Sequence, residues 1–117
     1  MQKRPGSALH SSWNWELISD KPLDWWIGKL AKIKKAYPTK ILVASIMAGS
    51  GNDKELRNWQ TLAEACQENG ADGLELNFGC PHGMCERGMG SAVGNEPKVL
   101  EEITRWAVEF AKTPVII

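Results

Sequence analysis

The residues whose types could support chemistry stand together in one stretch, from Asn77 to Gly90, directly after an apolar run. Cys80 follows Asn77 by three positions and precedes Pro81 and His82. A thiol can act as a nucleophile, a metal ligand, an acid or a base, and a histidine can shuttle protons. Pro81 fixes its own φ and restricts the residue before it, so the direction of the Cys80 thiol is pre-set. The alternative is that Cys80 is a small buried apolar residue.

The side chains around Cys80 leave several uses open. Asn77 offers a donor and an acceptor together, which suits an amide or imide edge, but asparagine also ends strands as a turn residue. His82 could equally be a loop histidine bonded to backbone. Cys80 and Cys85 do not have the spacing of a usual zinc site, and His82 alone is near as a third ligand, so we expect no metal here.

The glycines at positions 88, 90 and 94 do not have the spacing of a dinucleotide-binding fingerprint. Their expected use is conformational freedom for a mobile loop. The connection from Phe78 to Asn95 is also long, because strand-to-helix connections in α/β units usually have about 2–6 residues. We therefore interpret this loop as functional rather than structural.

The elements that must position this loop alternate along the chain. Residues 1–13 are expected to be loop, and residues 14–18 are ambiguous between strand and ordered loop. Apolar spacing predicts helices from about Pro22 to Tyr37, capped by Ser19 or Asp20, from Asn52 to Gly70, and from Pro97 to Lys112. Apolar runs predict strands over 41–47, 73–77 and 115–117, the first of them buried on both faces.

Such alternation predicts an α/β fold with parallel strands joined by right-handed crossovers. A doubly wound sheet and part of a (β/α)8 TIM barrel both fit, and in both the ligands bind at the carboxyl ends of the strands. The 117 residues supply about three parallel strands with flanking helices, whereas a barrel needs more than about 200 residues. We therefore expect residues 1–117 to be a fragment of a single barrel domain.

Net charge, apolar runs and cysteine count argue against several classes of protein. The net charge is zero, which gives no reason to expect nucleic acid as a partner. No apolar run reaches the roughly 20 residues that span a bilayer, and the start has no signal-like apolar segment. Three cysteines, an odd number, do not suggest a disulfide framework, so a reducing compartment, the cytoplasm, is expected.

The stretch from Asn77 to Met84, followed by Glu-Arg-Gly-Met-Gly at 86–90, resembles the flavin-containing barrel domain of dihydropyrimidine dehydrogenases. The resemblance continues in the segments 14–19, 44–47 and 70–76, in the same order, and covers nearly the whole chain from about Ser11. One departure is Gly79, where the family usually has serine. Related dihydroorotate dehydrogenases share the Asn, Cys and Pro of the loop.

The resemblance implies an FMN-dependent oxidoreductase of pyrimidine catabolism that reduces uracil or thymine to the 5,6-dihydro base. The electrons would come from NAD(P)H through FAD and iron–sulfur clusters in an electron-transfer domain or subunit, and the full-length enzyme would be an oligomer. Cys80 would be the general acid and His82 would assist proton supply. The implied substrate-binding residues are Asn14, Glu16, Ile18 and Asn77, and Asn77 would also contact FMN.

Two alternatives stay open. A dihydroorotate dehydrogenase of pyrimidine biosynthesis would use the same cysteine as a base. A non-catalytic truncated module would keep the loop without its reaction. Further flavin-binding residues of the family lie outside this stretch of barrel, so the isolated fragment is expected to be inactive and to hold FMN poorly.

Overall fold

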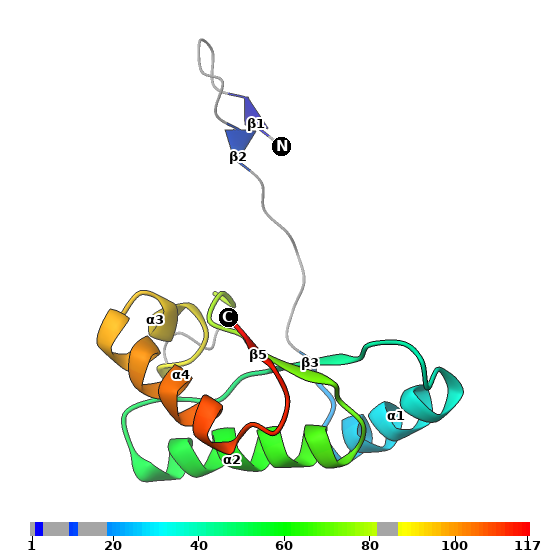
Figure 1. Ribbon diagram of the computed structural model, residues 1–117. Helices are drawn as coiled ribbons and strands as arrows, with labels where there is room; N and C mark the ends of the chain where they lie inside the picture. The colour runs from blue at the N-terminus through cyan, green and yellow to red at the C-terminus, as the bar shows by residue number, and fades with distance from the viewer. Residues whose placement is uncertain (1, 4–9, 12–18, 82–86) are drawn as a thin grey trace.

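The computed structural model describes residues 2–3, 10–11, 19–81 and 87–117. Helices alternate with strands over most of this part of the chain (Figure 1). Their bounds are α1 (Leu23–Ala36), β3 (Val43–Ile46), α2 (Asp53–Glu68), β4 (Gly73–Leu76), α3 (Ser91–Gly94), α4 (Pro97–Phe110) and β5 (Val115–Ile116).

Two very short strands, β1 (Gln2–Lys3) and β2 (His10–Ser11), pair antiparallel near the start of the chain. The sequence predicted only loop over this region, and that prediction is wrong for these residues. Two-residue strands contain too few positions to show an alternation of apolar and polar residues, so no periodic signal exists for them.

The sheet that matters for function contains β3, β4 and β5 in that order, and both pairings are parallel. Glu75 on the central strand β4 lies opposite Ser45 on one side and Ile116 on the other. The predicted α/β fold with about three parallel strands and flanking helices is therefore confirmed. The strand order is shared by one half of a doubly wound sheet and by a barrel, so it does not choose between them.

The helices cover one face of this sheet. Alternate strand residues, Ala44, Ile46, Leu74 and Leu76, are buried together with residues of the three long helices: Leu30 of α1, Trp59, Ala63 and Cys66 of α2, and Ile103 and Ala107 of α4. The residues between them point to the other side of the sheet, because side chains alternate along a strand.

That other side, the open face, carries Val43, Ser45, Glu75 and Ile116, and all four are exposed. The prediction that the first strand is buried on both faces is therefore wrong for the described part of the chain. Its ends were also placed too widely, since Ile41 lies outside β3 and is 83% exposed.

The start of α1 differs from the prediction as well. Pro22 stands at the N-cap and makes no side-chain cap bond. Ser19, expected as a cap, instead accepts hydrogen bonds through Oγ from the backbone N–H of Lys21 at 3.1 Å and from Nε1 of Trp26 at 2.8 Å. The apolar spacing placed six residues on one face of this helix: Leu23, Trp26, Ile27, Leu30, Ile33 and Tyr37. Only Leu30 of these is buried, whereas Trp26, Ile33 and Tyr37 are exposed.

The other two long helices agree closely with the sequence pattern. Asn52 caps α2 through its Oδ1, which accepts from the N–H groups of Lys54 and Glu55 at 3.0 and 3.1 Å. Gly70 follows the helix with φ of +100°, the left-handed conformation that ends helices. No described helix is both long and apolar enough to cross a membrane.

Candidate functional site

The site begins where β4 ends. The N–H of Asn77, the first residue after β4, donates to the carbonyl of Ile46, the last residue of β3, at 2.9 Å. The two strands therefore finish level with each other at one edge of the sheet. This is the carboxyl edge, where α/β folds place their ligands.

Asn77 organises the turn that follows. Its side-chain Oδ1 accepts hydrogen bonds from the backbone N–H groups of Gly79 and Cys80, both at 3.1 Å. This is an Asx turn, in which the side chain mimics a backbone carbonyl. The Nδ2 group takes no part in the turn and remains the portion of the amide that can donate to a ligand.

Cys80 is buried, with 9% of its surface exposed. Its N–H is held by Asn77, and its carbonyl oxygen accepts from the N–H of Ser91 at 3.1 Å. The backbone of Cys80 is therefore bonded on both sides of the Cα atom. The thiol direction then depends mainly on one side-chain torsion, which is the preorganisation that a catalytic group needs.

The loop after β3 contacts the same region. Oγ of Ser50 donates to the carbonyl of Gly88 at 2.9 Å, joining this loop to the returning part of the cysteine loop. The β3 loop is itself anchored to α2: Nε1 of the buried Trp59 donates to the carbonyl of Gly49 at 2.8 Å, and a carboxylate oxygen of Glu55 accepts from the N–H of Gly49 at 2.9 Å. Hydrogen bonds therefore hold the β3 loop to α2 and the cysteine loop to the β3 loop.

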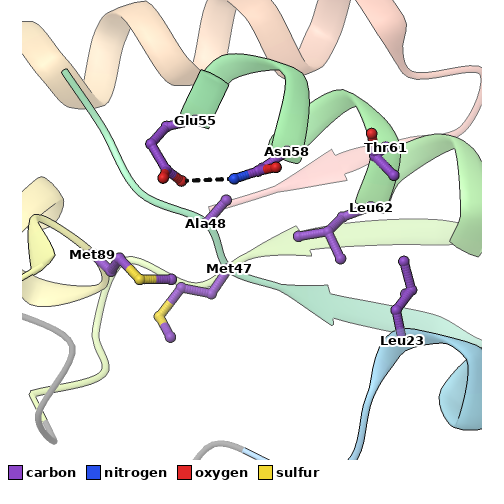
Figure 2. A pocket seen from close by; sticks show the side chains of 8 residues that line it. All are labelled: Leu23, Met47, Ala48, Glu55, Asn58, Thr61, Leu62 and Met89. Carbon is purple, nitrogen blue, oxygen red and sulfur yellow. Dashed lines mark hydrogen bonds between the residues drawn. The ribbon is translucent and has the colours of Figure 1, made fainter. Parts of the chain in front are cut away.

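Two of the cavities among the described residues reach this end of β3. The smaller, of about 250 Å³, is lined by Met47, Ala48, Leu62 and Met89 with polar groups of α2. Figure 2 shows Met47 and Met89 approaching each other from the two loops, and the hydrogen bond between Glu55 and Asn58 at the other side. The larger cavity, of about 510 Å³, lies along β3 and α1 and is lined by Met47 and Asn77 among others.

The three cysteines are not equivalent. Cys66 belongs to the core side of α2, and burial raises the pKa of its thiol. It therefore stays protonated and unreactive at neutral pH. Cys80 lies at the carboxyl edge, in the turn made by Asn77. Cys85 lies outside the described residues.

Of the predicted site residues, the structure places Asn77 and Cys80 together in one turn. His82, Asn14, Glu16 and Ile18 lie outside the described residues. Sequence reasoning missed Ser50, whose Oγ donates to the loop, and Ser91, whose backbone N–H does. It also missed α3 altogether. The four residues of α3 have no helical periodicity, and a serine bond between two loops leaves no pattern in a sequence.

Gly79, where the resemblance has serine, has an open environment. A Cβ atom added there would meet no other group within 4 Å. The substitution of serine by glycine therefore removes a hydroxyl without relieving any steric conflict at this position.

Comparison with known families decides between the two architectures. The profile of the family described as Dihydrouridine synthase (Dus) matches residues 50–117, which is more than half of the chain. This chain belongs to the dihydrouridine synthase family. The family has a TIM-barrel type of fold, so the three parallel strands and their helices are part of a (β/α)8 barrel.

Individual relatives carry related names. The chain is 42% identical over 113 residues to the chloroplastic dihydropyrimidine dehydrogenase (NADP(+)) of Arabidopsis thaliana. It is 38% identical over 103 residues to the NAD-dependent dihydropyrimidine dehydrogenase subunit PreA of Escherichia coli. These matches cover 94% and 88% of this chain but 26% and 24% of the relatives, so the chain spans about a quarter of their length.

A third relative, with a different name, matches a shorter stretch of the chain. Over 47 residues, 40% of this chain and 14% of the relative, the chain is 45% identical to the catalytic subunit of dihydroorotate dehydrogenase B (NAD(+)) of Methanopyrus kandleri. The predicted resemblance to dihydropyrimidine dehydrogenases is confirmed, and so is the predicted likeness to dihydroorotate dehydrogenases.

Proposed function

We propose that this chain carries the cysteine loop of a flavin-dependent oxidoreductase that reduces uracil or thymine to the 5,6-dihydro base. The names of the family and of its relatives all describe one chemical change, the interconversion of a pyrimidine ring and its dihydro form. The relatives named for free dihydropyrimidines match nine-tenths of the chain. Two dihydroorotate dehydrogenase subunits match less of it: one over 40% of the chain, and the other over 74% at the lower identity of 32%. This difference favours an uncharged pyrimidine base as substrate.

The observation that carries the proposal is the position of Cys80. Its backbone is held on both sides, by Asn77 and by Ser91, at the carboxyl edge of the sheet. When hydride reaches one carbon of the pyrimidine C=C bond, the electrons of that bond form an enolate-like anion that needs a proton at the neighbouring carbon. The thiol of Cys80 donates this proton, and the resulting thiolate is reprotonated from solvent with the help of His82.

FMN, when bound, supplies the hydride. The residues at this edge fit one side of its ring system: Nδ2 of Asn77 can donate to a ring carbonyl, and Met47 offers an apolar contact beside it. The cavity that both residues line, of about 510 Å³, has the size of ordinary small-molecule sites. Asn77 is thus proposed for both substrate and cofactor, with Asn14, Glu16 and Ile18 as further substrate contacts.

The remaining components would lie outside these residues. We propose that residues 1–117 form part of a single FMN-binding barrel, and that NAD(P)H, FAD and iron–sulfur clusters act in an electron-transfer domain or subunit of an oligomeric enzyme. We propose the cytoplasm as its location, although one relative is named as chloroplastic. Within these 117 residues the net charge is zero, so this part of the barrel has no excess of basic groups for RNA phosphates, which supports a free base rather than uridine within RNA as the substrate.

The test uses the full-length protein, with uracil and NAD(P)H in D₂O. Cys80→Ala should lower turnover by about 10²–10⁴-fold, because a positioned acid contributes that much. It should also slow deuterium entry at the protonated ring carbon. Cys66→Ala is the control, since Cys66 lies in the core. Near-normal turnover in Cys80→Ala would remove the proposed role and favour a non-catalytic module.

The second candidate function is oxidation of dihydroorotate, supported by the 45% identity to a dihydroorotate dehydrogenase subunit over 47 residues. In that reaction Cys80 would accept a proton as a base. Assaying the same protein with dihydroorotate and an electron acceptor separates the two. Faster turnover of dihydroorotate than of uracil or dihydrouracil would reverse our order of preference.

A further inference from the structure

Two glycines of the returning loop lie unusually close to the turn that contains Cys80. Gly90 directly precedes α3, and Gly94 ends it. A Cβ atom added to Gly90 would lie 2.4 Å from the carbonyl oxygen of Cys80 and 3.2 Å from its Cβ. A Cβ atom added to Gly94 would lie 2.4 Å from the carbonyl oxygen of Phe78. No side chain fits at either distance, so the close approach requires glycine.

The contact is bonded as well as close. The N–H of Ser91, the first residue of α3, donates to the carbonyl of Cys80 at 3.1 Å. Gly90 also has φ of +56° and ψ of −122°, a backbone conformation that glycine adopts readily and residues with a Cβ atom rarely adopt. Gly94 has no such constraint, so its requirement is purely steric. Gly90 is therefore required both for its backbone conformation and for the lack of space, whereas Gly94 is required only for the lack of space.

The turn cannot move away easily on its other side. The ring of Phe78 packs against that of Trp59 with 5.8 Å between centroids, and Trp59 is 1% exposed. The returning loop is also held from the β3 loop by the bond between Ser50 and Gly88. An added methyl group at Gly90 or Gly94 must therefore displace the backbone around Cys80, or α3, or both.

We propose that Gly90 and Gly94 are positioning residues, which let α3 lie directly against the carbonyls of Cys80 and Phe78 and so fix the Cys80 thiol for proton transfer. The catalytic part of this inference rests on the proposed function of Cys80. The geometric part does not, because it concerns only where the thiol lies. This gives the glycines a use in the resting structure that differs from the mobility expected from the sequence.

The experiment measures alkylation of each cysteine in the full-length protein by iodoacetamide, resolved by peptide mass spectrometry, alongside turnover with uracil. Gly94→Ala and Gly90→Ala are compared with Gly28→Ala. Gly28 lies within α1, and a Cβ added there meets nothing within 4 Å. Cys66, buried in the core, reports any general loosening of the fold within the same molecules.

Both loop variants should alkylate Cys80 several-fold faster than the wild type while leaving the rate at Cys66 unchanged. Turnover should fall by about 10- to 100-fold, because a displacement near 1 Å in a reacting group has this effect. Gly90→Ala should be the more severe, since it adds backbone strain to the steric conflict. Gly28→Ala should match the wild type in all three measurements.

Three results would overturn the inference. These are an unchanged alkylation rate at Cys80, a parallel increase at Cys80 and Cys66, and a selective increase at Cys80 without loss of turnover when Cys80→Ala itself does lose turnover. Cys80→Ala decides the proposed function separately. If that variant keeps its turnover while the glycine variants still change Cys80 selectively, the geometry stands and the general-acid role fails.

Discussion

At the scale of single residues, Asn77 holds a turn with one side-chain atom and is proposed to bind a ligand with another. Oδ1 holds the turn by accepting from the N–H groups of Gly79 and Cys80, whereas Nδ2 remains for a ligand. The sequence left this residue open between a turn former and a ligand contact. The structure shows the first task directly, and the second belongs to the proposed function, so the two tasks require separate tests.

Two substitutions at Asn77 distinguish these tasks. Serine keeps a neutral acceptor that can form a similar though weaker turn, and alanine keeps none. Asn77→Ser should therefore hold the alkylation rate of Cys80 near that of the wild type, and Asn77→Ala should raise it. Both should lower turnover by roughly tenfold or more, because both lose the amide donor.

The measurements are iodoacetamide alkylation and uracil reduction in the same preparations of the full-length protein. Equal alkylation rates in the serine and alanine variants would show that the Asx turn does not position the thiol. Undiminished turnover in Asn77→Ser would show instead that Nδ2 makes no contact that matters to the reaction.

At the scale of elements, the ion pair between Lys34 of α1 and Asp72 before β4 joins two distant parts of the chain. Nζ of Lys34 lies 2.7 Å from one carboxylate oxygen of Asp72, and that oxygen also accepts from the N–H of Leu42 at 2.8 Å. The hydrogen bond from Lys34, followed by that from Leu42, lowers the pKa of Asp72. The pair therefore fixes α1 beside the start of both β3 and β4.

This lowered pKa predicts a pH dependence of stability. A carboxylate whose pKa is lower in the folded state stabilises that state fully above its unfolded pKa, about 3.9, and loses the contribution as pH falls through the folded value. Asp72→Asn should therefore lower the free energy of unfolding at pH 7. It should also weaken the loss of stability that the wild type shows below about pH 4.

Urea unfolding of the 117-residue chain at several pH values measures this effect. Glu101→Gln, at an exposed position of α4, is the control for removal of a carboxylate. If Asp72→Asn and the wild type lose stability in parallel below pH 4, the ion pair does not contribute in the way proposed.

The elements also show how far the sequence alone could lead. The apolar spacing of α2 and α4 predicted both helices, because their packing faces are long enough to show a period. The spacing of α1 predicted its location but not its burial: Trp26 and Ile33 fall on the expected face and are still exposed. Periodicity indicates which residues share a face, but it does not say how much of that face a neighbour covers.

In the candidate site, too, some features could be predicted from the sequence and others only from the structure. Cys80 and Asn77 could be singled out from their place after an apolar strand, since that placement is written in the local sequence. The contacts of Gly90 with Cys80 and of Gly94 with Phe78 could not, because they arise when the chain returns 10 and 16 residues later. A glycine needed for close approach and a glycine needed for flexibility look identical in a sequence.

At the scale of the whole molecule, the open face of the sheet is the feature that a barrel must account for. On this face Oγ of Ser45 donates to a carboxylate oxygen of Glu75 at 3.1 Å, and Val43 and Ile116 lie exposed beside them. In a closed barrel this face points inward and its side chains are packed in layers. Ser45 and Glu75, which are exposed in the 117-residue chain, would then be buried in the closed barrel.

Ser45→Ala tests this change of setting. In the 117-residue chain, where the pair is exposed, the substitution should alter the free energy of unfolding by no more than about 0.5 kcal/mol. In the full-length protein it should cost about 1–3 kcal/mol, because it removes a hydrogen-bond partner from a buried carboxylate. Urea unfolding monitors the first case, and hydrogen exchange of the amides of β3 and β4 monitors the second.

The effects in the 117-residue chain and in the full-length protein can be compared directly, because the same atoms are removed in both. A small effect in the chain and a larger one in the full-length protein would place Ser45 and Glu75 in the interior of the closed barrel. A small effect in both would mean that this face stays in contact with water, as in a wide or incompletely closed barrel. In that case the row formed by Ser45, Glu75 and Ile116 could not exclude water beneath the carboxyl edge, as the reaction proposed for Cys80 would require.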